Sequence, residues 1–136
     1  MITDRLTPVL STPYWELFHE APGGVVLLRR LALRAESPQH LKDQNETVKL
    51  QLRATRPRLG IVVDVREAPP PTEGIDAAML PLREATYRLF QRVAVLFGSQ
   101  VGVLHLKRLG YPEGAQVLAT TDEREAFAFA RAASEP

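Results

Sequence analysis

The chain contains no cysteine, and this absence excludes several kinds of chemistry at once. It rules out disulfides, thiol nucleophiles, thiolate-bound zinc and iron–sulfur clusters. Long apolar runs are missing too: none approaches the roughly 18 residues of a membrane span, and residues 1–13 lack the apolar core of a signal peptide. The sequence therefore predicts a cytoplasmic protein that is neither exported nor transmembrane.

The chain also lacks a large excess of positive or of negative side chains. The 17 basic and 16 acidic side chains give a net charge of +1 and are mixed along the chain. A nucleic-acid partner normally requires a basic face, so we expect no such partner. The densest basic group, formed by Arg29, Arg30 and Arg34, is interpreted as a solvated strand edge.

Catalytic and metal-binding motifs are absent as well. His19, His40 and His105 fall on separate predicted elements, without the spacing of a metal site. The chain also has neither a G-x-S-x-G motif nor a glycine-rich phosphate loop, so we expect no metal, no cofactor and no enzymatic activity. An acid–base set of Asp64, His105 and Arg66 would require the fold to bring three separate residues together.

The chain does have enough length for one core. Its 136 residues suit a single domain, placed at residues 14–133 between an N-terminal tail or edge segment (1–13) and a short C-terminal tail (134–136). The run Gly60–Arg66 is continuously apolar up to Asp64 and is typical of a strand buried on both faces. The carboxyl ends of such strands form the edge where open α/β sheets bind ligands.

Apolar periodicity predicts an α/β fold with a mixed sheet, helices packed on the sheet and the order β-β-α-β-α-β-α-β-α. Strands are expected at residues 14–20, 25–33, 60–66, 93–97 and 116–120, and helices at 37–55, 75–90, 99–109 and 122–133. Pro81 leaves two alternatives: a short turn before a helix that begins there, which we favour, or one kinked helix. Residues 99–109 also alternate like a strand, but their place between two strands favours a helix.

Three of these elements carry further expectations. The residues Ala21–Gly24 are typical of a β-turn that joins the first two strands into a hairpin. Helix 37–55 has a thin apolar stripe interrupted by Asn45, which predicts modest burial. The first strand is rich in aromatic residues and is a candidate edge for a homodimer formed by strand pairing, unless residues 1–13 cover it. These aromatic residues are Tyr14, Trp15 and Phe18.

Polar residues gather where the central strands are expected to end. They are Asp64 at the end of one strand, Thr72 and Asp76 at the start of the next helix, and Ser99 and Gln100 at the following helix start. Free N–H groups at such helix starts bind an anion or a carboxylate of a partner. Alternatively, Asp64 accepts hydrogen bonds from the following loop, and Thr72 or Asp76 and Ser99 cap the helices.

Four segments carry a family resemblance by their order and spacing. They are Ile61–Arg66 as the central strand, Ala77–Arg83 leading into a helix, Arg92–Leu96 as the next strand and Thr121–Ala126 opening the last helix. This arrangement resembles the STAS domain of bacterial anti-sigma-factor antagonists, and more narrowly the STAS-like proteins grouped with CRAL-TRIO lipid-binding domains. The resemblance covers Tyr14 to about Ala133 and implies a STAS-like fold.

The resemblance does not extend to a phosphorylation switch. STAS antagonists of the switching type carry an Asp-Ser-Ser-Gly-like segment after the central strand, and phosphorylation of a serine there releases the partner. The matching segment here, Ile75–Met79, has alanines in place of the hydroxyls, and Thr72 is the one hydroxyl in the preceding loop. Because alanine cannot accept phosphate, we expect that no serine kinase controls this loop.

The resemblance implies two functions. The leading hypothesis is a non-catalytic regulatory module that docks a protein partner on Glu67–Met79 and the start of the Ser99 helix. The alternative is a carrier of an apolar small molecule or lipid, held between the sheet and the helix Ile75–Phe90, which includes Met79. Because an apolar stripe of this kind also fills an ordinary core, a packed core without a cavity would contradict the carrier hypothesis.

Overall fold

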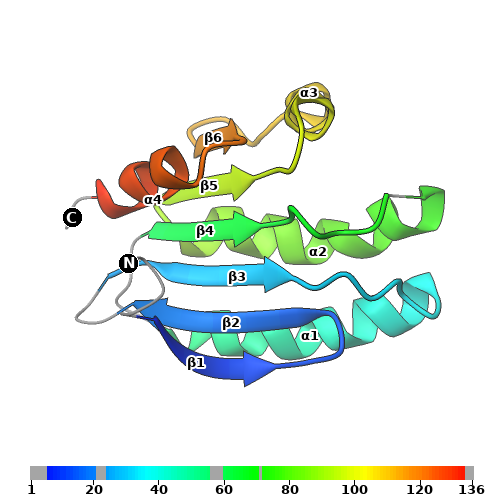
Figure 1. Cartoon of the computed structure of the whole chain (residues 1–136). Helices are drawn as coiled ribbons and strands as arrows, with labels where there is room; N and C mark the ends of the chain where they lie inside the picture. The colour runs from blue at the N-terminus through cyan, green and yellow to red at the C-terminus, as the bar shows by residue number, and fades with distance from the viewer. Residues whose placement is uncertain (1–5, 21–23, 56–59, 71, 134–136) are drawn as a thin grey trace.

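Six strands in chain order form one sheet at the centre of the molecule (Figure 1). The computed structural model describes residues 6–20, 24–55, 60–70 and 72–133. The strands are β1 (Leu6–Ser11), β2 (Trp15–Glu20), β3 (Val26–Arg30), β4 (Gly60–Asp64), β5 (Arg92–Leu96) and β6 (Gln116–Thr120). The first three strands pair antiparallel, and β3 to β6 run parallel, so the predicted mixed sheet is confirmed.

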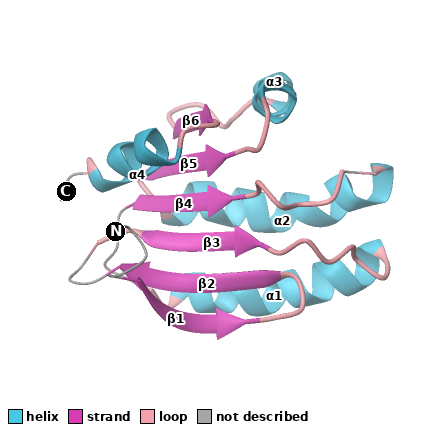
Figure 2. Cartoon of the chain, viewed as in Figure 1, coloured by secondary structure: helices cyan, strands magenta, loops and turns pink. Residues whose placement is uncertain are grey.

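Four helices alternate with the parallel strands (Figure 2). They are α1 (Pro38–Arg53), α2 (Glu73–Leu89), α3 (Gln100–Leu109) and α4 (Glu123–Arg131). The helical alternative for residues 99–109 is thus confirmed, and the α4 helix begins after Asp122, whose side chain caps it. Within the described ranges, no helix combines the length and the apolarity that crossing a membrane requires.

The N-terminal segment forms a strand that the predicted order lacks. Residues 6–11 form β1, which pairs with β2 along the sheet edge, with an irregularity in register between Pro8 and Leu10. The prolines of this segment argued against a strand, but an edge strand tolerates proline. The edge of β2 is therefore covered, and a homodimer would need another surface. The antiparallel β2–β3 pairing agrees with the predicted hairpin, although residues 21–23 of its turn lie outside the described residues.

Helix α2 runs through Pro81 without interruption, so the favoured expectation of a helix beginning near Pro81 is wrong. The helix begins at Glu73, two residues before the predicted range of 75–90. Proline removes one helical hydrogen bond, but buried residues lie on both sides of it, including Ala78 and Leu82. Their packing supplies the stability that the local sequence lacks.

Helices cover both faces of the sheet (Figure 1). Helices α1 and α2 pack on one face, and α4 packs on the other. Because successive residues of a strand point to opposite faces, Ile61 contributes to the α1–α2 core and Val62 to the α4 core. Strand β4 is thus buried on both faces, as its continuous apolar sequence predicts.

Helix α1 buries one narrow face that includes Asn45. Ser37 Oγ accepts a hydrogen bond from the backbone N–H of His40, which confirms the predicted N-cap. Asn45, expected to weaken the apolar stripe, is 1% exposed and its Oδ1 accepts a hydrogen bond from Trp15 Nε1 at 2.7 Å. The buried face of this helix is therefore narrow, as predicted, but Asn45 continues it between Leu41 and Val48 instead of interrupting it, because the buried amide has a specific partner.

The basic group on β3 is not a solvated edge. Strand β3 lies between β2 and β4, inside the sheet. Arg30 is 5% exposed and donates hydrogen bonds to the carbonyls of Leu31 and Leu33 at 2.6 and 2.9 Å. Arg29 forms ion pairs on the opposite face, and Arg34 alone is exposed. Arg30 can be buried and Arg29 partly buried because each has oxygen partners.

Candidate functional site

A cavity of about 700 Å³ lies between the sheet and helices α2 and α3. Val63 of β4 and Val95 of β5 line it near the carboxyl ends of these strands. Both valines are only partly buried, whereas Ile61 and Val93, two residues earlier on the same face, are 0% and 2% exposed. Val63 and Val95 therefore pack at the margin of the core and leave part of their apolar surface facing the cavity.

The loop after β4 and helix α3 complete the cavity wall. Pro69 and Pro70 line the cavity from the loop. Proline fixes the backbone φ angle, so this part of the wall loses little conformational entropy when a ligand binds. Val101 and Leu106 line the cavity from α3. Together with the two prolines, they make this part of the cavity wall mainly apolar.

Asp76 and His105 form one polar pair at the cavity. Asp76 Oδ2 of α2 lies 3.7 Å from His105 Nε2 of α3. This separation permits an ion pair when the histidine is protonated, but it is too long for a hydrogen bond. His105 Nε2 is buried and has no hydrogen-bond partner among the described residues. The pair is therefore available to bind a polar group of a ligand.

Arg83 and Tyr87 form a second polar pair, one helical turn apart on α2, and both line the cavity. The Tyr87 hydroxyl is buried without a hydrogen-bond partner in the described part of the chain, which ordinarily costs about 1–3 kcal/mol. Burial raises the pKa of Tyr87, and the positive charge of Arg83 opposes that rise. The hydroxyl therefore stays protonated at neutral pH and can donate a hydrogen bond to a ligand.

The structure brings some of the predicted site residues together. Asp76, Met79 and Ser99 line the cavity, whereas Thr72 and Gln100 do not. Thr72 and Ser99 occupy the N-cap positions of α2 and α3, where the capping alternative places them. Neither side chain accepts a capping hydrogen bond, so their positions agree with that alternative but their contacts do not.

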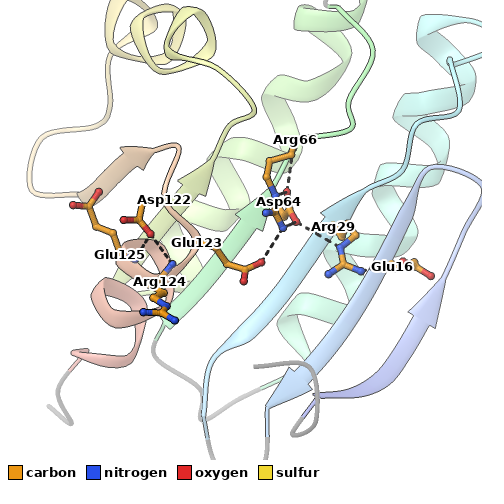
Figure 3. Close-up of polar contacts among 8 residues, drawn as sticks. All are labelled: Glu16, Arg29, Asp64, Arg66, Asp122, Glu123, Arg124 and Glu125. Atoms are coloured by element: carbon orange, nitrogen blue, oxygen red, sulfur yellow. Dashed lines mark hydrogen bonds and ion pairs between the residues drawn. The ribbon is translucent and has the colours of Figure 1, made fainter. Parts of the chain in front are cut away.

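Asp64 is absent from the cavity lining and belongs to a charged network that reaches α4 (Figure 3). Its Oδ1 accepts hydrogen bonds from the backbone N–H and Nε of Arg66, each at 3.0 Å, and its Oδ2 accepts one from Nη2 at 2.8 Å. Arg29 Nε lies 3.5 Å from Oδ2, and Arg66 also contacts Glu123 of α4. The alternative in which Asp64 accepts hydrogen bonds from the following loop is confirmed.

The network keeps Asp64 ionised. Burial alone would raise the pKa of Asp64, but the hydrogen bonds and charge of Arg66, together with the charge of Arg29, outweigh burial and lower it. The acid–base set considered from the sequence does not assemble, because no hydrogen bond or ion pair joins Asp64 to His105 within the described ranges.

Sequence reasoning missed Arg83 and Tyr87 as site residues. With Asp76 and Met79, they recur at steps of three and four along α2, so all four share one face of the helix. This three- and four-residue spacing could have indicated the site from the sequence. It was obscured because the apolar residues of the same helix form a more conspicuous stripe.

Comparison with known proteins identifies the fold. No protein-family model and no curated protein sequence matches the chain. A solved structure from Shewanella loihica PV-4, an uncharacterised protein of the DUF3478 family described as having a SpoIIAA-like fold, aligns with a TM-score of 0.59 and 12% identity. The alignment covers 92% of this chain and 91% of that chain. The protein therefore has a SpoIIAA-like, STAS-like fold, which confirms the resemblance found in the sequence.

Proposed function

We propose that this protein is a non-catalytic binding module that holds an apolar small molecule in the cavity between β4, β5, α2 and α3. The observation that carries this proposal is the cavity itself, whose volume of about 700 Å³ falls within the usual range for small-molecule sites. A packed core at this place would have contradicted a carrier function. Partly buried Val63 and Val95 on the central strands instead leave apolar surface for a ligand to cover.

The single tryptophan offers a direct readout of binding. Trp15 lines the cavity, so a bound fluorophore that absorbs near the tryptophan emission quenches it by energy transfer. We expect N-phenylnaphthylamine, a neutral apolar probe, to bind and quench Trp15. Replacing Val95 with phenylalanine fills part of the cavity and is expected to weaken binding about tenfold or more.

The control for this experiment is Leu50→Phe. Leu50 lies on α1, is 65% exposed and does not line the cavity, so the same probe should bind this variant as it binds the unmodified protein. Circular dichroism melts establish that both variants are folded. Absence of probe binding, or equal binding by all three proteins, would contradict the proposal.

A second function, docking of a protein partner, is favoured by exposed apolar residues on α3. Val101 and Leu104 are 76% and 51% exposed near the start of this helix. They adjoin Ser99 and extend the surface that the sequence indicated for a partner. Because Val101 also lines the cavity, a partner that docks here would contact the cavity wall.

Docking on α3 predicts a position-specific loss of binding. Val101→Glu should abolish chemical cross-linking to a partner protein, because it places a charge in an apolar contact. Leu50→Glu introduces the same charge at a comparably exposed leucine of α1 and should leave cross-linking intact. Cross-linking that survives Val101→Glu would remove α3 from consideration as the docking surface.

A further inference from the structure

We infer that the molecule held in the cavity is an apolar monoanion, and that Arg83 and Tyr87 bind its carboxylate. This inference rests on the proposed function and specifies the chemical class of its ligand. It follows from two groups on one face of α2 that lack partners within the described chain. The Tyr87 hydroxyl can donate one hydrogen bond, and the Arg83 guanidinium can donate several.

The partners of the charged residues around the cavity single out Arg83. The other charged lining residues have partners: Arg66 pairs with Asp64 and Glu123, Arg30 donates to two backbone carbonyls, and Asp76 faces His105. Arg83 forms no ion pair with any described residue. Arg83 is therefore the one charged lining residue with neither an ion pair nor a side-chain hydrogen bond in the described part of the chain, and its guanidinium is available to pair with one negative charge on a ligand.

The geometry of the two groups suits a carboxylate. Residues four apart on a helix lie side by side on its surface, so Arg83 and Tyr87 can contact one small head group together. A carboxylate accepts hydrogen bonds on two oxygens and matches the planar guanidinium. The apolar remainder of the ligand would then cover Val63 and Val95 on the sheet.

Displacement of N-phenylnaphthylamine by decanoate and by decanol, at neutral pH, tests the inference. The two competitors have the same chain length, and the alcohol partitions more readily from water into an apolar site because it carries no charge. We nevertheless expect decanoate to displace the probe at a concentration about tenfold lower. Arg83→Gln should abolish this preference and leave displacement by decanol nearly unchanged.

Two further variants complete the design. Tyr87→Phe removes the hydroxyl alone and should reduce the preference for decanoate. Arg88→Gln removes an exposed arginine of the same helix that does not line the cavity, and should preserve the preference. Equal displacement by the two competitors, or a preference that survives Arg83→Gln, would overturn the carboxylate inference while leaving the cavity function in place. Failure of the probe to bind would overturn both.

Discussion

Replacing Gly60 with alanine is expected to destabilise the fold by roughly 3 kcal/mol, as overpacking of a close backbone contact does. A Cβ atom at Gly60 would lie 2.0 Å from the carbonyl oxygen of Ala130 and 2.7 Å from its carbonyl carbon. Both are backbone atoms of α4, so no side chain can rotate away to relieve the overlap. The added methyl group would have to push α4 off the sheet.

Gly102→Ala is the matched control for this prediction. A Cβ atom there would lie 2.4 Å from Cδ1 of Phe97, a partly buried side chain that lines the cavity and can move into it. Alanine also favours the helix by up to about 1 kcal/mol over glycine. Urea unfolding should therefore show a large loss for Gly60→Ala and a small change for Gly102→Ala. Equal losses would mean that backbone contact with α4 does not explain the requirement for Gly60.

The sequence predicts β4, which contains Gly60, and helix α4, which packs against it. Continuous apolar residues predict β4 and β5, and the spacing of Ala126, Phe127, Ala130 and Ala133 predicts the inner face of α4. The first three are buried, whereas Ala133 lies beyond the end of the helix and is only partly buried. Local preference misleads where tertiary packing outweighs it, as in the strand that contains Pro8 and the helix that contains Pro81. In both places, residues next to the proline pair or pack with other elements, and these contacts maintain the strand or the helix.

The candidate site was predictable in part. Helix starts after parallel strands bring Asp76 and Ser99 to one cavity, as the α/β order indicates. Asp64 is different because strand residues alternate: Val63 lines the cavity, and the side chain of the next residue points to the other face. The cavity itself could not be predicted, because an apolar helix face has the same sequence pattern whether the space beneath it is filled or open.

Asp64→Asn is expected to destabilise the protein by about 3 kcal/mol at neutral pH. Asp64 is 4% exposed, and its carboxylate accepts three hydrogen bonds from Arg66 and faces Arg29 at 3.5 Å. An asparagine supplies no negative charge and turns an amide N–H₂ toward one guanidinium. Arg66 then keeps only Glu123, and Arg29 only Glu16, as counter-charges, and both of these carboxylates are partly exposed. Loss of the buried counter-charge costs more than the loss of an exposed ion pair.

The pH dependence identifies the carboxylate as the cause. Because the pKa of Asp64 is lowered in the folded protein, its contribution to stability is complete above the unfolded value of about 4 and is lost as pH falls through the folded value. The difference in unfolding free energy between the two proteins should therefore be constant near neutral pH and shrink in acid. A difference that persists unchanged in acid would show that charge is not what Asp64 contributes.

Two further measurements distinguish the structural role of Asp64 from ligand binding. They are the stability of Glu123→Gln and the binding of the probe by Asp64→Asn. Glu123 has a half-exposed side chain at the outer end of the network, so its replacement should cost less than about 1 kcal/mol. Asp64 does not line the cavity, so folded Asp64→Asn protein should bind N-phenylnaphthylamine as tightly as the unmodified protein. A stable Asp64→Asn variant with impaired probe binding would instead link the charged network to the cavity through Arg66, which bonds to Asp64 and lines the cavity.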